Sequence, residues 1–100
     1  MKHCMLAKFK DTVTEEQKTH LISEVFPLFK ELEKIDGIEA VTCRRNCIDR
    51  PNRYDIFIEI TMEEAALPVY DESEPHKNWK KNYGEYLENK AIFDYNEEEG

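Results

Sequence analysis

The stretch Tyr54-Asp55-Ile56-Phe57-Ile58-Glu59-Ile60 alternates with a period of two. Tyr54 and the three isoleucines would share one face of a β-strand, and Asp55, Phe57 and Glu59 would share the other. The isoleucine face is apolar enough to lie against a core, whereas the second face mixes an aromatic ring with carboxylates. This is the clearest strand in the chain, and it predicts a sheet with one buried face.

Three further segments are predicted strands. Residues 2–10 alternate in the same way, and the more apolar set, expected to face helices, is His3, Met5, Ala7 and Phe9. Residues 38–45 are polar enough to form a half-exposed strand. Residues 90–95 form the last strand, with Ala91, Phe93 and Tyr95 on one face and Ile92 and Asp94 on the other.

The first helical region follows the first strand. Thr14 and Gln17 form a capping box, in which each side chain satisfies a backbone donor of the first turn. A broad apolar stripe at helical period then runs to Leu32. Pro27 lies inside this stripe and predicts a kink or a local break. Gly37, after Asp36, supplies the stop signal.

The second helical region lies between the third and fourth strands. Thr61 and Glu64 predict another capping box and a short helix. Ser73 is expected to cap a longer helix that runs to about residue 86. His76 precedes Trp79 by three residues on this helix, which places His76 on its inward edge.

The order β-α-β-β-α-β indicates an α+β fold, with helices on one face of a four-stranded antiparallel sheet. We expect residues 1–100 to form one domain, in which residues 95–100 are an acidic tail. The sheet face away from the helices is too apolar for water and too charged for a core; it carries Cys4, Leu6, Lys8, Phe57 and Glu59, and Ile92 is a further candidate.

A second copy of the chain explains this mixed face. We predict a homodimer through Leu6, Lys8, Phe57 and Glu59, in which Lys8 and Glu59 are able to pair across the sheet. The alternative is a mixed face that stays in water.

The charge of the chain excludes two classes of partner. There are 22 acidic against 14 basic residues, a net charge of −8, which opposes nucleic-acid binding and docking on anionic membranes. No segment approaches the ~20 apolar residues of a membrane span. All four arginines fall between Arg44 and Arg53. They either recognise a carboxylate or phosphate, or form a solvated loop that offsets acidic neighbours.

The three cysteines, an odd number without a secretory signal, predict free thiols in a reducing, cytoplasmic compartment. Cys43 and Cys47 are four residues apart, with no second pair and no nearby His. This spacing falls short of a zinc site, so no metal is expected.

Several short motifs, in their order and spacing, resemble the stress-responsive A/B-barrel (Dabb) family over nearly the whole chain. They are Met1-Lys2-His3, Lys8-Phe9-Lys10, Thr14-Glu15-Glu16-Gln17, Tyr54-Asp55, Glu74-Pro75-His76-Lys77 with Trp79, and Ile92-Phe93-Asp94-Tyr95. The resemblance implies a ferredoxin-like fold and a homodimer whose two sheets face each other as an α+β barrel.

The resemblance also implies a pocket. A plant branch of the family closes a polyketide ring by aldol chemistry. In that branch the pocket between sheet and helices is lined by a His of the first strand, a His of the third strand, and a Tyr followed six residues later by a His. His3, Tyr70 and His76 match these positions here, whereas the branch's third-strand His corresponds to Ile56.

An imidazole with a pKa near ~6.5 exchanges protons at neutral pH. We therefore assign catalysis to His76 as the base, Tyr70 as its partner and His3 as a second donor. The alternative is that His3 is a strand-end residue with a satisfied hydrogen bond and His76 a partly exposed first-turn residue. The residues expected to bind substrate are Tyr54, Ile56, Met5 and Trp79, and such walls suit a small apolar or aromatic molecule.

We predict a Dabb-type protein that binds a small molecule. The same residues could support acid–base catalysis of the cyclase, lyase or isomerase kind, which would need no cofactor. The alternatives are a non-catalytic, stress-related interaction dimer and a haem-using monooxygenase of the same superfamily, which needs an axial His and room for a porphyrin. RNA binding is disfavoured, because residues 54–60 lack the basic-Gly-aromatic pattern of ferredoxin-like RNA-binding domains.

Overall fold

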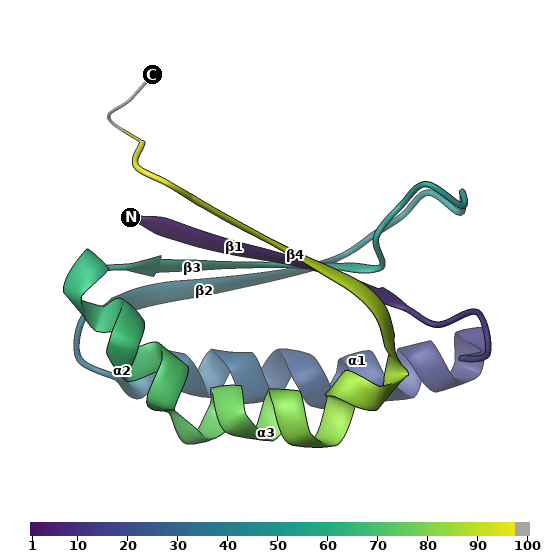
Figure 1. Cartoon of the computed structure of the whole chain (residues 1–100), viewed down its shortest axis with the longest axis horizontal. Coiled ribbons are helices and arrows are strands. Elements are labelled where there is room, and N and C mark those ends of the chain that lie inside the picture. Colours follow the sequence, from purple (N-terminus) through teal and green to yellow (C-terminus); the bar gives the residue numbers. More distant parts are fainter. Residues whose placement is uncertain (98–100) are drawn as a thin grey trace.

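A computed structural model of the chain describes residues 1–97. Its sheet has the order β2-β3-β1-β4, and all neighbouring strands are antiparallel. The strands are β1 (Lys2–Phe9), β2 (Ile38–Arg45), β3 (Ile56–Met62) and β4 (Leu87–Tyr95). The helices are α1 (Glu15–Lys30), α2 (Leu67–Glu72) and α3 (Glu74–Tyr83), with 3₁₀ turns at Glu31–Lys34, Glu64–Ala66 and Gly84–Tyr86. The helices lie against one face of the sheet and leave the other uncovered, which is the predicted ferredoxin-like α+β fold (Figure 1).

The start of α1 is as predicted, but its interior is not. The Thr14 side chain accepts from the Gln17 backbone N–H at 3.2 Å, and the Gln17 side chain accepts from the Thr14 N–H at 2.8 Å. The predicted break at Pro27 is wrong, because α1 continues through Pro27 to Lys30. Val25 and Phe29, on either side of the proline, are fully buried. Their packing on the sheet holds the helical path despite the missing backbone donor.

Gly37 ends the first helical region as predicted. Its φ of +92° lies in the left-handed region, and a Cβ at this position would stand 2.9 Å from the Cβ of Ala66. Both facts favour glycine at the turn into β2.

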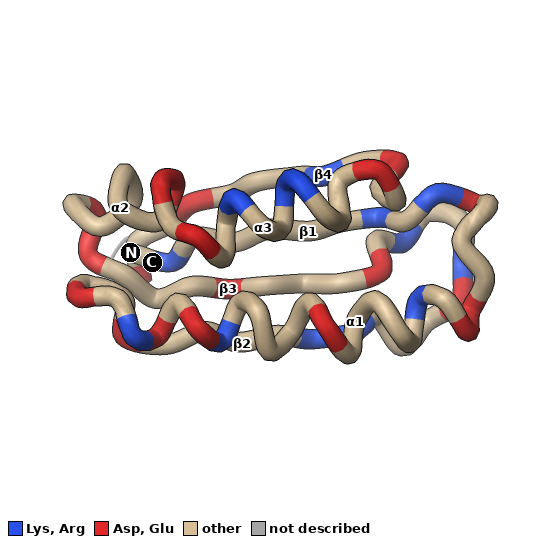
Figure 2. Tube along the Cα trace, turned by 90° about the horizontal axis from the view of Figure 1, so that it is seen from below, with Lys and Arg blue, Asp and Glu red and all other residues tan. Residues whose placement is uncertain are grey.

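The core lies between the sheet and the helices. The alternating residues predicted to face the helices are all buried in β1 (His3, Met5, Ala7, Phe9) and in β3 (Ile56, Ile58, Ile60). Burying each isoleucine contributes about 1.5–3 kcal/mol. The isoleucine face of β3 is therefore a principal source of stability. The opposite sides of α1 and α3 carry mixed acidic and basic residues toward water (Figure 2).

The third strand begins and ends two residues later than predicted, and this displaces the second capping box. Thr61 lies inside β3, where it pairs with Lys2 of β1 and its hydroxyl accepts from the Lys2 ammonium at 2.7 Å. The following 3₁₀ turn begins after Glu63, which makes no side-chain capping bond. Pairing with β1 extends the ladder and overrides the local capping signal.

The register of β4 corrects the prediction for Ile92. Ile92 lies opposite Met5, and Phe93 lies opposite Cys4. Because directly paired residues share a face, Ile92 lies on the helix side and Phe93 on the uncovered side. Both are largely exposed, at 51% and 66%, since β4 is an edge strand.

Lys8 and Glu59 do not pair within this chain. Glu59 lies opposite Cys4, and its carboxylate accepts from the Cys4 thiol at 3.7 Å and from the Tyr95 hydroxyl at 3.1 Å. Lys8 is four residues further along β1, where its ammonium donates to the Pro51 carbonyl. Strand register therefore separates two groups that sequence alternation places only on a common face.

The described chain reaches Glu97, whose carboxylate lies 3.5 Å from the Lys2 ammonium. Glu98 and Glu99 of the predicted acidic tail lie outside the described residues. No helix within residues 1–97 is both long and apolar enough to cross a membrane.

Candidate functional site

His3, Tyr70 and His76 come together at one end of the sheet, from β1, α2 and the first turn of α3. The ring of Tyr70 lies 5.1 Å from that of His3 and 4.5 Å from that of His76, centroid to centroid. Tyr70 thus contacts both imidazoles. The structure places the three predicted catalytic residues in one cluster.

The junction between α2 and α3 sets the position of Tyr70 relative to His76. Ser73 caps α3, because its hydroxyl accepts from the backbone N–H of His76 at 3.4 Å. The same hydroxyl donates to the carbonyl of Tyr70 at 2.6 Å. One serine therefore connects the two residues, and their six-residue spacing becomes a ring contact.

Asp94 belongs to this cluster and was missed by sequence reasoning. It lies directly opposite His3 on β4, and its Oδ1 accepts from His3 Nδ1. A carboxylate only accepts, so we assign the Nδ1 proton to His3, which leaves Nε2 for another partner. The available signal was the alternation of residues 90–95, which placed Asp94 on the face opposite Phe93.

His76 is held as a neutral imidazole. Its Nδ1 lies 3.1 Å from the carbonyl oxygen of Asp71, so Nδ1 donates and Nε2 keeps its lone pair. Partial burial lowers its pKa below the usual 6.5, an effect that the hydrogen bond to Asp71 opposes and the charge of Lys80 reinforces. At neutral pH this residue is suited to accept a proton.

Tyr70 is held as a protonated phenol. Its side chain is 2% exposed, and burial raises its pKa well above the usual 10. The carboxylates of Asp71 and Asp94 raise it further. A buried phenol next to a neutral imidazole is a hydrogen-bond donor rather than a base.

Two of the four predicted substrate-binding residues lie away from the cluster. His3 pairs with Ile60, whereas Ile56 pairs with Ala7, four residues along the ladder. At ~3.3 Å per residue this is about 13 Å. The Tyr54 hydroxyl accepts from the Asn89 amide at 3.2 Å.

Tyr54 also departs from the predicted isoleucine face. It lines a hollow of about 330 Å³ with Leu6 and Phe57, which belong to the uncovered side of the sheet. The alternation starts only at Ile56, because the chain before it belongs to the loop between β2 and β3. Tyr54, one of the residues expected to bind substrate, therefore lies apart from the His3 cluster.

The other two predicted walls, Met5 and Trp79, are core residues between sheet and helices. Both are buried, and Trp79 contacts Phe29 edge to face with ring centroids 5.3 Å apart. Trp79 also follows His76 on α3, as predicted. Met5 lies two residues from His3 on the same strand face.

A surface hollow of about 610 Å³ lies beside the cluster, over α2 and the start of α3. Its lining is chiefly apolar and includes Ile35, Pro68, Val69 and Pro75. Ser73, which caps His76, also borders it. His3, Tyr70 and His76 do not line this hollow, which adjoins the cluster through residues 73–75, directly before His76 in the chain.

Comparisons with known proteins place this geometry in context. Residues 1–97 match the model of the Stress responsive A/B Barrel Domain family. No curated protein matches the chain.

Three solved structures illustrate the likeness. The protein At3g17210 from Arabidopsis thaliana is 25% identical over 95% of this chain and 92% of that chain, with a TM-score of 0.72. A dimeric protein of ferredoxin-like fold from Bacteroides fragilis NCTC 9343 is 23% identical over 94% and 92%, with a TM-score of 0.83. Hydroxynitrile lyase from Passiflora edulis is 16% identical over 96% and 93%, with a TM-score of 0.72. The last two show a likeness of fold alone.

Proposed function

The chain belongs to the stress-responsive A/B barrel (Dabb) family, and on that premise we propose that it binds a small molecule and performs acid–base chemistry with His76, Tyr70 and His3. The observation that carries the proposal is the contact of the buried Tyr70 with both imidazole rings. The proposed chemistry needs no cofactor.

Each residue has a distinct part in this chemistry. His76, neutral and with Nε2 free, takes a proton from a carbon acid or a hydroxyl. The protonated phenol of Tyr70 donates a hydrogen bond to the carbonyl oxygen on which negative charge develops. His3 offers a second polar contact, and Asp94 holds it in one orientation. The reaction class is that of a cyclase, lyase or isomerase; the hydroxynitrile lyase from Passiflora edulis is built on the same fold.

The proposed ligand is a small apolar or aromatic carbonyl compound. The hollow at the α2–α3 junction supports this choice: its volume of about 610 Å³ is within the usual range for small-molecule sites, and its walls are largely apolar.

We also propose that the single domain of residues 1–100 acts as a homodimer through the uncovered sheet face with Leu6, Lys8, Phe57 and Glu59. Phe93, 66% exposed on this face, supports the idea, since a large apolar side chain in water is a cost that a partner removes. The related-fold proteins from Bacteroides fragilis and Thermobifida fusca are dimeric. Three free cysteines support a reducing, cytoplasmic setting.

A ligand screen followed by NMR tests the proposed site. Aromatic aldehydes, ketones and β-keto acids would be titrated into the protein, with the imidazole signals of His3 and His76 as the readout. We expect a saturable shift of both signals in the parent protein. The shift should be lost in Tyr70→Phe and should be retained in Val13→Ala, a buried control outside the cluster.

Two outcomes would contradict the proposal. One is the absence of any saturable shift across the screen, which would favour a non-catalytic interaction dimer. The other is binding that Tyr70→Phe and His76→Gln leave unchanged, since the ligand would then occupy another part of the molecule.

A further inference from the structure

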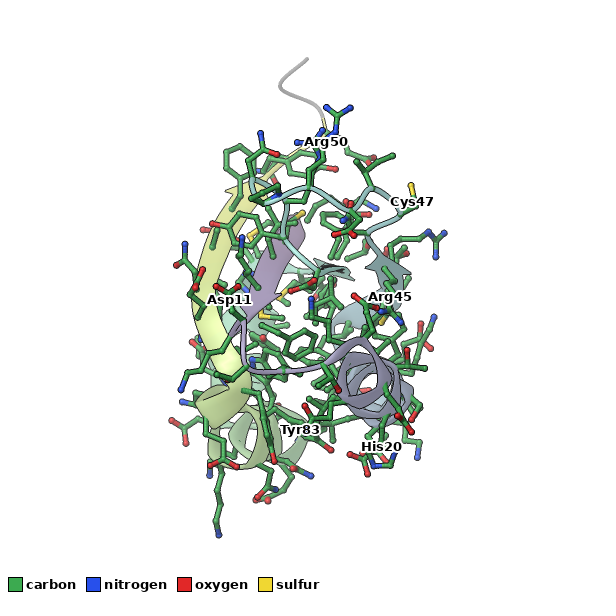
Figure 3. The ribbon with its side chains drawn as sticks, turned by 90° about the vertical axis from the view of Figure 1, so that its right-hand side faces the viewer. Asp11, His20, Arg45, Cys47, Arg50 and Tyr83 are labelled. Atoms are coloured by element: carbon green, nitrogen blue, oxygen red, sulfur yellow. The ribbon has the colours of Figure 1, made fainter. Side chains whose placement is uncertain are left out.

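A second large hollow lies at the opposite end of the sheet from His3. It has about 700 Å³ and is bounded by the end of β1, the start of α1 and residues 45–55, which include the loop between β2 and β3. Figure 3 looks onto this end, where Arg50 and Cys47 mark the loop and Asp11 and Arg45 lie on opposite sides below it. We call this hollow the loop cleft.

Basic residues concentrate here in a chain whose net charge is −8. Three of the four arginines line the loop cleft, together with Lys8 and Lys18; these arginines are Arg45, Arg50 and Arg53. Five cations therefore meet four carboxylates, those of Asp11, Glu15, Asp49 and Asp55. The loop cleft is locally basic, against the charge of the whole protein.

Two of these carboxylates are already engaged within the chain. Asp55 accepts from the Phe9 backbone N–H at 2.7 Å and from the Lys18 ammonium at 3.2 Å. Glu15 accepts from the Arg45 guanidinium at 2.8 Å. These pairs join the walls of the loop cleft, so Lys18 and Arg45 are engaged in holding the walls together.

The other three cations have no carboxylate partner within residues 1–97. Lys8 donates to the Pro51 carbonyl, and Arg53 donates to the Asn52 side-chain oxygen at 2.7 Å. Arg50, at the loop, makes no ion pair with any described residue. Guanidinium groups have a planar fork of donors that matches oxyanions, and the two arginines together could hold a ligand with several negative oxygens.

We propose that the loop cleft is a second binding site, which takes a small oxyanion-bearing molecule through Arg50 and Arg53. The shared chemistry is a phosphate or carboxylate group with more than one negative charge. More than one negative charge is expected because the two arginines can then each pair with a separate oxyanion group. Asp11 and Asp49 also border the loop cleft and oppose the binding of any anion. The site is independent of the His3–Tyr70–His76 cluster at the other end of the sheet.

Calorimetric titration of the full chain tests this site, with pyrophosphate in one arm and citrate in the other, at constant ionic strength set by sodium chloride. We expect saturable binding in at least one arm, and the arm identifies a phosphate or a carboxylate ligand. Arg50→Ala and Arg53→Ala should each weaken it about tenfold, the effect of one lost charge-assisted hydrogen bond. Asp49→Asn should tighten it, because a repelling charge is removed.

Lys34→Ala is the matched control, since it removes one exposed positive charge at the other end of α1. Binding should be unchanged in this variant. Circular dichroism would establish that each variant is folded, and light scattering that its oligomeric state is unchanged. The proposal is overturned if neither anion binds, if Arg50→Ala and Arg53→Ala bind as the parent does, or if Lys34→Ala weakens binding equally.

Discussion

His3 and Asp94 lie directly opposite each other on the paired strands β1 and β4, and the Asp94 carboxylate accepts a hydrogen bond from His3 Nδ1 although the two residues are 91 positions apart. His3 is buried and Asp94 is exposed. The pair therefore satisfies the one buried imidazole of the candidate site from the edge strand of the sheet. The orientation of the His3 ring, and therefore the position of its Nε2, depends on the pairing of β4 with β1.

Removing the carboxylate should destabilise the domain. Asp94→Ala leaves the buried Nδ1 of His3 without its acceptor, which costs roughly 1–3 kcal/mol of unfolding free energy. Urea unfolding measures the effect. Glu88→Ala, an exposed acid of the same strand, is the matched control and should change the free energy of unfolding far less. An equal loss of unfolding free energy in the two variants would show that the hydrogen bond between Asp94 and His3 adds nothing beyond the effect of an alanine on this strand.

The hydroxyl and the ring of Tyr70 have separable roles. Tyr70→Phe keeps the ring between His3 and His76, so it should change stability by less than about 1 kcal/mol. Tyr70→Ala creates a cavity in the core and should cost about 3–5 kcal/mol. Binding of a carbonyl ligand should nevertheless be lost in Tyr70→Phe, because the hydroxyl donor is missing. Normal ligand binding by Tyr70→Phe, measured by the NMR titration described above, would reduce Tyr70 to a packing residue.

Stability should fall as the solution is acidified through the titration of His76. The folded state holds the pKa of His76 below the unfolded value of 6.5, so the unfolded state binds more protons between the two values. The contribution of His76 to the free energy of unfolding is fully present above pH 6.5. It is lost progressively as the pH falls through the unfolded and then the folded pKa, and no further loss follows below both. Thermal unfolding between pH 8 and pH 5 measures it.

The matched variant for this pH dependence is His76→Gln, which has no titrating group. Its unfolding temperature should change less over the same interval than that of the parent. An identical pH dependence of the two proteins would assign the effect to other groups.

Neighbouring residues of β4 test the uncovered sheet face. Phe93 lies on that face and Ile92 on the helix side, yet both are largely exposed. Phe93→Asp places a charge in the proposed dimer interface and should shift the protein toward monomer, whereas Ile92→Asp should not. Size-exclusion chromatography with light scattering gives the mass. A monomeric parent, or a dimer that Phe93→Asp leaves intact, would contradict the proposed interface.

Local interactions account for what the sequence predicted well. The capping box of Thr14 with Gln17 involves residues three apart, and so does the cap of α3, in which Ser73 accepts from the backbone N–H of His76. Alternation identified the buried faces of β1 and β3 because a strand has a side-chain period of two. These features follow from neighbours along the chain, so they were visible before the fold was known.

The features that sequence reasoning missed depend on register between distant strands. Thr61 lies in β3 and does not cap a helix, because it pairs with Lys2 of β1. Tyr54 does not share the isoleucine face, because β3 begins only at Ile56. The fold class and the starts of α1 and α3 were thus determined by the sequence alone. Only the tertiary structure decided that Asp94 meets His3 and that Ile92 faces the helices, because strand pairing, rather than any local preference, brings such residues together.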